Sequence, residues 1–228
     1  MNEYLIPVIM LSVVPSIIFY KIWRRWKQIE YIQSHNFPRG LFDKLKEKHP
    51  QFGAKEFQLV ARALRQFFLA HLKSGKKYVS MPSQVTDDLW HDFILYTRNY
   101  DQFCKKAFGR FLHHTPAVVL SSSKLDNEGL RRVWWYSCKE ENIDPKAATR
   151  LPLLFAIDKK LGINNGFVYS LDCKRYSESA VVAGAGVVHC GGDFSDSGID
   201  GGTDGFGDSD SGGGDGGDSG CGGGCGGD

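Results

Sequence analysis

The stretch AKEFQLVARALRQFFLAHLK (residues 54–73) carries the clearest helical pattern in the sequence. Apolar side chains recur there at helical spacing on one face, and Gly75 follows as a C-cap. The members of this face are Phe57, Val60, Ala61, Leu64, Phe67, Phe68, His71 and Leu72. An amphipathic helix of this length indicates a helical domain that packs against its apolar face.

Four further segments have helical signals. A short helix over residues 39–49 would end at Pro50, and a longer one over residues 83–107 has an apolar face and precedes Gly109. Two more helices are expected over residues 124–141 and over residues 152–162, the second ending at Gly162. We therefore expect an all-α fold: a compact domain of about five helices, preceded by a single N-terminal transmembrane helix and followed by a disordered Gly/Asp-rich tail.

The N-terminal segment has the composition of a membrane anchor. Residues 4–20 (YLIPVIMLSVVPSIIFY) contain no charged side chain, and with the next apolar residues the span reaches about 20 residues, or about 30 Å of helix. Only Glu3 precedes it, and the basic segment KIWRRWK (residues 21–27) follows, which favours an uncleaved anchor over a signal peptide. The basic flank predicts a single-pass membrane protein with most of the chain in the cytoplasm, where its six cysteines stay reduced.

The C-terminal part differs from the rest in charge. Residues 190–228 contain 18 glycines and nine aspartates and no other charged side chain, so they carry −9. Because the formal net charge of the whole chain is +2, residues 1–189 carry a net charge of +11. Residues 1–27 account for +3 of it, which leaves +8 on residues 28–189. Such a tail buries too little apolar surface to fold and should be disordered. Its CGGGC segment (residues 221–225) offers two thiols, fewer than the four ligands of a structural zinc site.

These features divide the chain into three parts. Residues 1–27 form the predicted anchor with its basic flank, residues 28–178 the helical cytoplasmic domain, and residues 179–228 the disordered glycine-rich acidic tail.

Three segments carry a resemblance to a known family. LWHDFILYTRNYDQFCKKAFGRFLHHTP (residues 89–116), LPLLFAIDKKLGI (residues 151–163) and CGGGCGGD (residues 221–228) resemble the bacterial glycine-rich domain-containing proteins, which are membrane-anchored and distantly similar to plant glycine-rich domain proteins. The resemblance covers about residues 35–175 and the style of the tail. It implies a helical module and no particular reaction.

The histidines give the best candidates for a site. Asp87 and His91 stand four residues apart, so they project from one side of a helix, nearly opposite its apolar face. His113 and His114 follow that helix and can fold back toward it. We therefore consider a divalent metal site, zinc being one example, formed by Asp87, His91, His113 and His114.

Simpler interpretations of these residues stay open. Asp87 and His91 can be a solvated helix-surface pair, and His113 and His114 can complement the dipole at a helix end. His71, a further candidate, lies within an apolar face and can be a hydrogen-bonded core residue. The spacing matches no defined metal motif.

Two functions follow from these observations. The first is a membrane-tethered interaction module that binds a protein partner, with the acidic tail as adaptor or mask. The alternative is a metal-dependent, hydrolase-like enzyme that uses the Asp/His cluster. Nucleic-acid binding is disfavoured, because the basic residues of 28–189 are scattered among sixteen acidic ones. The sequence has no G-x-S-x-G motif and no phosphate-binding glycine loop.

Overall fold

The computed structural model describes residues 5–114, 124–171 and 188–190, which form seven helices and two short strands. The elements are α1 Leu5–Ser34, α2 Arg39–Lys48, α3 Ala54–Lys73, α4 Gln84–Leu95, α5 Thr97–Ala107, α7 Lys124–Glu140, α8 Leu153–Leu161, β1 Val168–Ser170 and β2 Val188–Cys190. The expectation of a helical domain is confirmed. The two strands, which pair in parallel with Val168 opposite Val188, were not expected.

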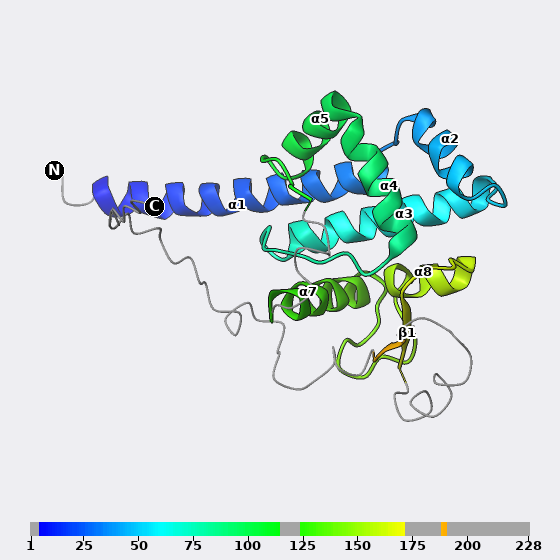
Figure 1. Cartoon of the computed structure of the whole chain (residues 1–228). Coiled ribbons are helices and arrows are strands. Elements are labelled where there is room, and N and C mark those ends of the chain that lie inside the picture. The colour runs from blue at the N-terminus through cyan, green and yellow to red at the C-terminus, as the bar shows by residue number, and fades with distance from the viewer. Residues whose placement is uncertain (1–4, 115–123, 172–187, 191–228) are drawn as a thin grey trace, which may run out of the picture.

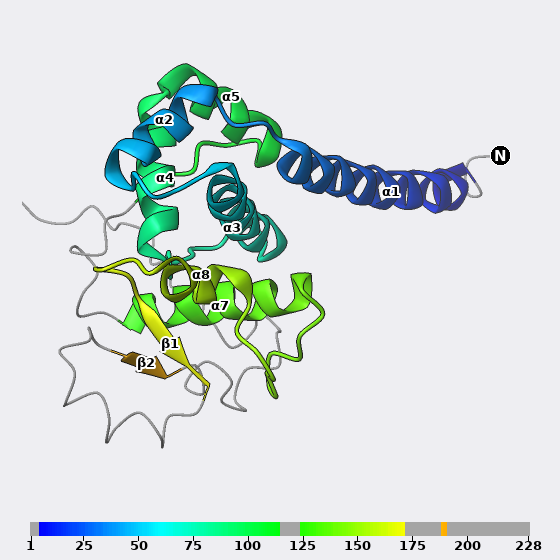
Figure 2. The ribbon, with the colours of Figure 1, turned by 90° about the vertical axis from the view of Figure 1, so that its right-hand side faces the viewer.

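Helix α3 lies at the centre of the domain (Figures 1 and 2). It contacts α1 and α4 on one side and α7 and α8 on the other. Residues outside its predicted apolar face, such as Ala63 and Leu69, are therefore buried as well. Gln66 is buried too, and its side chain donates to Glu141 at 3.0 Å and accepts from the Leu154 amide at 3.0 Å, so both polar ends are satisfied.

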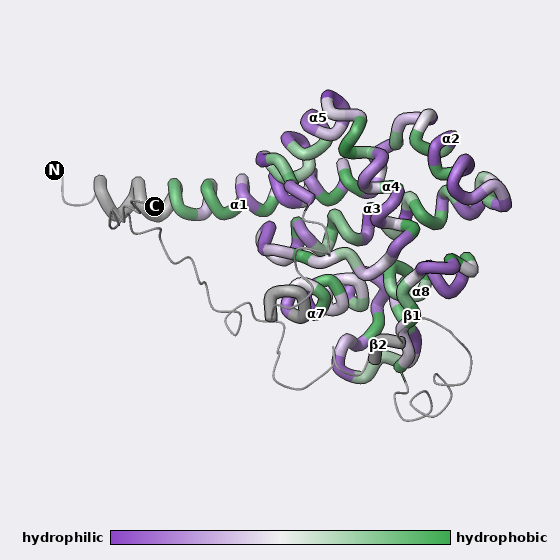
Figure 3. The backbone as a smooth tube through the Cα atoms, viewed as in Figure 1, coloured by the Kyte–Doolittle hydropathy of each residue, from purple (hydrophilic) through white to green (hydrophobic). Residues whose placement is uncertain are grey.

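The predicted single N-terminal transmembrane helix is not supported. Among the residues that the structure describes, no helix combines the length and the apolar composition needed to cross a membrane. Helix α1 contains the predicted anchor together with its basic flank, and it runs without a break through residues 21–27 to Ser34. Its second half belongs to the domain, where Ile32 is buried and Arg25 donates to the Lys73 carbonyl at 2.7 Å. The first half extends away from the other helices (Figures 1 and 3).

The segment expected to form one helix over residues 83–107 forms two. The backbone leaves the helical region at Tyr96, where ψ is 58°, and α5 begins at Thr97. The change of direction brings Phe93 of α4 and Tyr100 of α5 edge to face, with ring centroids 5.2 Å apart. Both rings are fully buried, so the break lets two apolar faces share one core.

Helix α8 holds the beginning of α4 through the buried carboxylate of Asp158. Its oxygens accept from the Ser83 hydroxyl at 2.8 Å and from the backbone amides of Gln84 and Val85 at 2.7 and 3.2 Å. These amides belong to the first turn of α4, which has no intrahelical acceptor for them. Asp158 also accepts from the Phe167 amide at 2.9 Å, and this approach needs Gly166, where a Cβ would lie 2.6 Å from the Asp158 Cβ.

The predicted disordered tail (residues 179–228), with its CGGGC segment, lies outside the described residues except for β2.

Candidate metal centre

Asp87, His91 and His114 come together at the surface of α4. Asp87 and His91 stand one turn apart on this helix, and His114 approaches them from the segment that follows α5. The His114 Nε2 lies 2.8 Å from the Asp87 Oδ1, and the His91 Nδ1 lies 3.5 Å from the Asp87 Oδ2. One ligand atom from each residue lies within 4.8 Å of the others. The three residues therefore form a compact Asp/His/His cluster.

The cluster is shielded on one side and open on the other. The His114 side chain is 11% exposed, Asp87 is 22% exposed and His91 is 46% exposed. The His114 ring meets the Trp90 ring at 4.5 Å and the His91 ring at 4.1 Å between centroids. Solvent therefore reaches the cluster from the His91 side.

A chain of two hydrogen bonds at the edge of the core places His114. The Trp90 indole donates to the Tyr100 hydroxyl at 3.1 Å, and that hydroxyl donates to the Leu112 carbonyl at 2.6 Å. Burial raises the pKa of Tyr100, so the phenol keeps the proton that it donates. Leu112 is two residues before His114, and the bond ties this segment to the core between α4 and α5.

Two predicted candidates lie elsewhere. His113 is exposed and its ring lies 4.8 Å from the Phe111 ring, so it does not join the cluster. His71 is buried in α3, where its Nδ1 lies 3.0 Å from the Lys77 carbonyl oxygen. Burial lowers the pKa of His71 to about 4, which keeps the imidazole neutral. It has the character of a core histidine.

The donor set suits a transition metal. Two imidazole nitrogens and one carboxylate oxygen are common ligands of zinc and of non-haem iron. Ligand atoms about 2.0–2.1 Å from a tetrahedral zinc ion are about 3.4 Å apart. The two contacts use different oxygens of Asp87: Oδ2 lies 3.5 Å from the His91 Nδ1, and Oδ1 lies 2.8 Å from the His114 Nε2. A zinc ion held by one of these oxygens would need that oxygen about 3.4 Å from both ring nitrogens, so the side chains would shift on binding.

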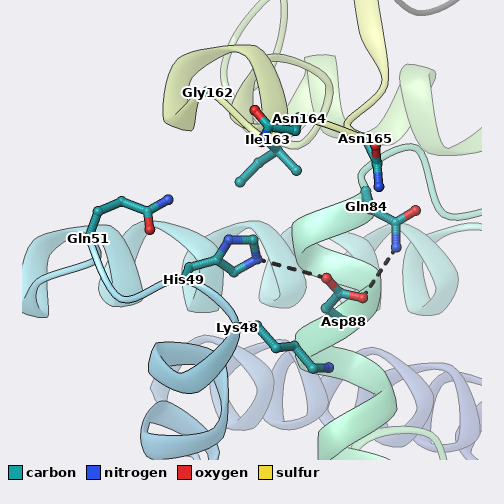
Figure 4. A pocket seen from close by; sticks show the side chains of 9 residues that line it. All are labelled: Lys48, His49, Gln51, Gln84, Asp88, Gly162, Ile163, Asn164 and Asn165. Atoms are coloured by element: carbon teal, nitrogen blue, oxygen red, sulfur yellow. Dashed lines mark hydrogen bonds and ion pairs between the residues drawn. The ribbon is translucent and has the colours of Figure 1, made fainter.

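A polar pocket of about 550 Å³ lies on the neighbouring side of α4 (Figure 4). Its lining consists of Lys48, His49, Gln51, Gln84, Asp88, Gly162, Ile163, Asn164 and Asn165. The His49 Nε2 lies 3.9 Å from the Asp88 carboxylate, which also accepts a hydrogen bond from the side-chain amide of Gln84 at 3.2 Å. None of the three cluster residues lines this pocket, so the two features are separate.

Sequence reasoning did not assign the residues that hold the cluster in place. These residues are Trp90 and Tyr100, and neither was singled out as a support for the cluster. The ten-residue separation between Trp90 and Tyr100 spans the break at Tyr96, so helical periodicity could not reveal their bond.

The fold and the cluster define a helical domain with a surface Asp/His/His site. A family model described as UCP032817-like matches residues 27–194, which include all three cluster residues. The chain belongs to this UCP032817-like family. No curated protein and no solved structure matches the chain.

Proposed function

We propose that this protein binds one divalent transition-metal ion, zinc in the first place, through Asp87, His91 and His114, and that the ion supports a hydrolytic reaction. The observation that carries the proposal is the approach of His114 to Asp87. Asp87 and His91 lie one helical turn apart, and His114, 27 residues after Asp87, adds a third ligand to them. Of the two functions expected from the sequence, this geometry favours the metal-dependent one.

The number of ligands supports a catalytic site over a structural one. Structural zinc sites use four protein ligands, whereas catalytic sites use three and keep a position for water or substrate. Here three ligands converge and the His91 side faces solvent. When bound, the ion would lower the pKa of a coordinated water toward neutrality and make it a nucleophile.

The hydrogen-bonded segment behind His114 also supports the proposal. A surface ion pair contributes only a few tenths of a kcal/mol and needs no buried support. His114 instead stands against Trp90 and follows the segment anchored by Tyr100. Fixing a ligand from behind is typical of metal sites, where supporting contacts set ligand orientation.

The binding part of the proposal is tested with the purified full-length chain. Zinc titration by calorimetry should show one site per chain, and cobalt substitution should give the visible absorption of a four- or five-coordinate ion. Added azide should change that spectrum if a position is open. The absence of a site that saturates at micromolar zinc would refute metal binding, while a cobalt spectrum insensitive to azide would refute the open position.

A second candidate function is partner binding by α1. Its support is a set of exposed large apolar side chains along the described part of this helix: Val13, Val14, Ile17, Ile18, Phe19, Tyr20, Ile22, Trp23 and Trp26. Contiguous apolar surface of this kind is typical of interaction sites. Sedimentation of the full chain beside a Phe19→Ser/Trp23→Ser variant tests whether a second copy is the partner, since only the parent chain should then associate.

A further inference from the structure

Three cations from separate parts of the chain meet beside α1. Arg24 lies on α1, Lys76 follows α3, and Arg110 follows α5. The Arg110 guanidinium donates to the Lys76 carbonyl oxygen, and an added Cβ at Gly109 would lie only 3.0 Å from the Arg24 Nη2. We name Arg24, Lys76 and Arg110 the basic cluster.

The basic cluster has no acidic partner among the described residues. No ion pair of those residues includes any of the three side chains, or the neighbouring Lys21 and Arg25 of α1. The pKa of Lys76 is lowered by burial and then by the charges of Arg24 and Arg110, which indicates that the three cations act on one another.

The backbone holds Lys76 in this position. Its φ is 65°, in the left-handed region that non-glycine residues rarely adopt. Its amide donates to the His71 carbonyl at 2.9 Å and its carbonyl accepts from Arg110. The backbone of this turn is therefore held in place, and an anion placed among the three cations would offset their repulsion.

The same chain contains a segment of opposite charge. Residues 190–228 carry nine aspartates and no lysine or arginine. Because the segment is covalently joined to the domain, its effective concentration near the basic cluster does not depend on the protein concentration in solution. We infer that the aspartates of residues 190–228 bind the basic cluster of Arg24, Lys76 and Arg110 and occupy it in competition with external anions. This inference does not depend on the metal centre.

The test uses the full chain and compares backbone amide signals by NMR at low salt. Changing all nine aspartates of residues 190–228 to asparagine should shift the signals of Arg24, Lys76, Gly109 and Arg110. The shifts should vanish near 1 M salt, because the Debye length is about 10 Å at 0.1 M salt and only about 3 Å at 1 M. They should also vanish when the nine changes are made in an Arg24→Gln/Lys76→Gln/Arg110→Gln background.

A matched control has the same loss of charge at another place. Lys46, Lys55 and Arg62 are exposed, and Lys46→Gln/Lys55→Gln/Arg62→Gln removes three positive charges outside the basic cluster. In that background the shifts at the basic cluster should persist. If the shifts are absent, or are as large at these three positions as at the basic cluster, the inference is overturned. Binding of inorganic pyrophosphate that is equally tight with and without the nine aspartates would also overturn it, because the basic cluster would then take external anions without competition.

Discussion

Asp87 and His114 are joined by a 2.8 Å contact between carboxylate and imidazole, although 27 residues separate them in the chain. The contact closes a loop that contains most of α4 and all of α5. It also turns a helix-surface pair of Asp87 and His91 into a three-residue cluster, on which the proposed metal site depends.

The adjacent histidines provide a matched pair of variants. His114→Ala should weaken zinc binding by more than about 100-fold, because it removes a ligand and changes to supporting residues alone cost about 10–100-fold. His113→Ala should leave the affinity unchanged, since that ring lies against Phe111 and outside the cluster. Calorimetric titration of both variants with zinc checks this. Equal losses would mean that the segment binds metal through a different arrangement.

Tyr100→Phe should weaken the metal centre without touching it. The variant leaves the buried Trp90 indole and the Leu112 carbonyl without their shared partner, which should lower the free energy of unfolding by about 1–3 kcal/mol. Zinc affinity should fall by about 10-fold, because His114 loses the support of its segment. Urea unfolding and zinc titration measure the two effects. Tyr31→Phe, on α1, is the control and should leave the zinc affinity unaltered.

Asp158→Asn should destabilise the domain by about 3 kcal/mol. The buried carboxylate accepts hydrogen bonds from three backbone amides and from the Ser83 hydroxyl. In the variant, the side-chain NH₂ group of the new asparagine would replace one acceptor oxygen, and it would itself be a donor facing donors. The free energy of unfolding in urea should decrease by this amount, whereas Asp43→Asn at an exposed position should have little effect. A change below about 1 kcal/mol for Asp158→Asn would show that α8 does not hold α4 in this way.

Acid should destabilise the domain through His71. Its pKa is lowered from 6.5 to about 4 by burial, so the unfolded chain binds its proton first as the pH falls. Above pH 6.5, neutral His71 makes its full contribution to the free energy of unfolding. Between pH 6.5 and about 4 this contribution is lost, at up to about 1.4 kcal/mol per pH unit. His71→Gln can still donate to Lys77 but does not titrate, so its free energy of unfolding should fall less over this interval. Parallel pH curves for the two proteins would show that His71 is not responsible.

Local patterns were enough to predict the parts of the fold that depend on local geometry. The apolar repeat of residues 54–73 predicted α3, and the four-residue spacing predicted that Asp87 and His91 share a side of a helix. Periodicity works here because hydrogen bonds between residues four apart set the direction of every side chain. The same rule did not predict the break at Tyr96, where packing of Phe93 against Tyr100 outweighs a continuous helix.

The sequence by itself determined that this chain forms a helical domain around residues 54–73 and that Asp87 and His91 are neighbours. The tertiary structure alone decided which of His113 and His114 joins them, because the choice depends on the bond from Tyr100 to Leu112 and on the Trp90 ring. It also decided that the second half of α1 packs within the domain, where Ile32 is buried, and that Asp158 holds the start of α4. These contacts join residues far apart in the chain, so they form only when the packed core brings their elements together.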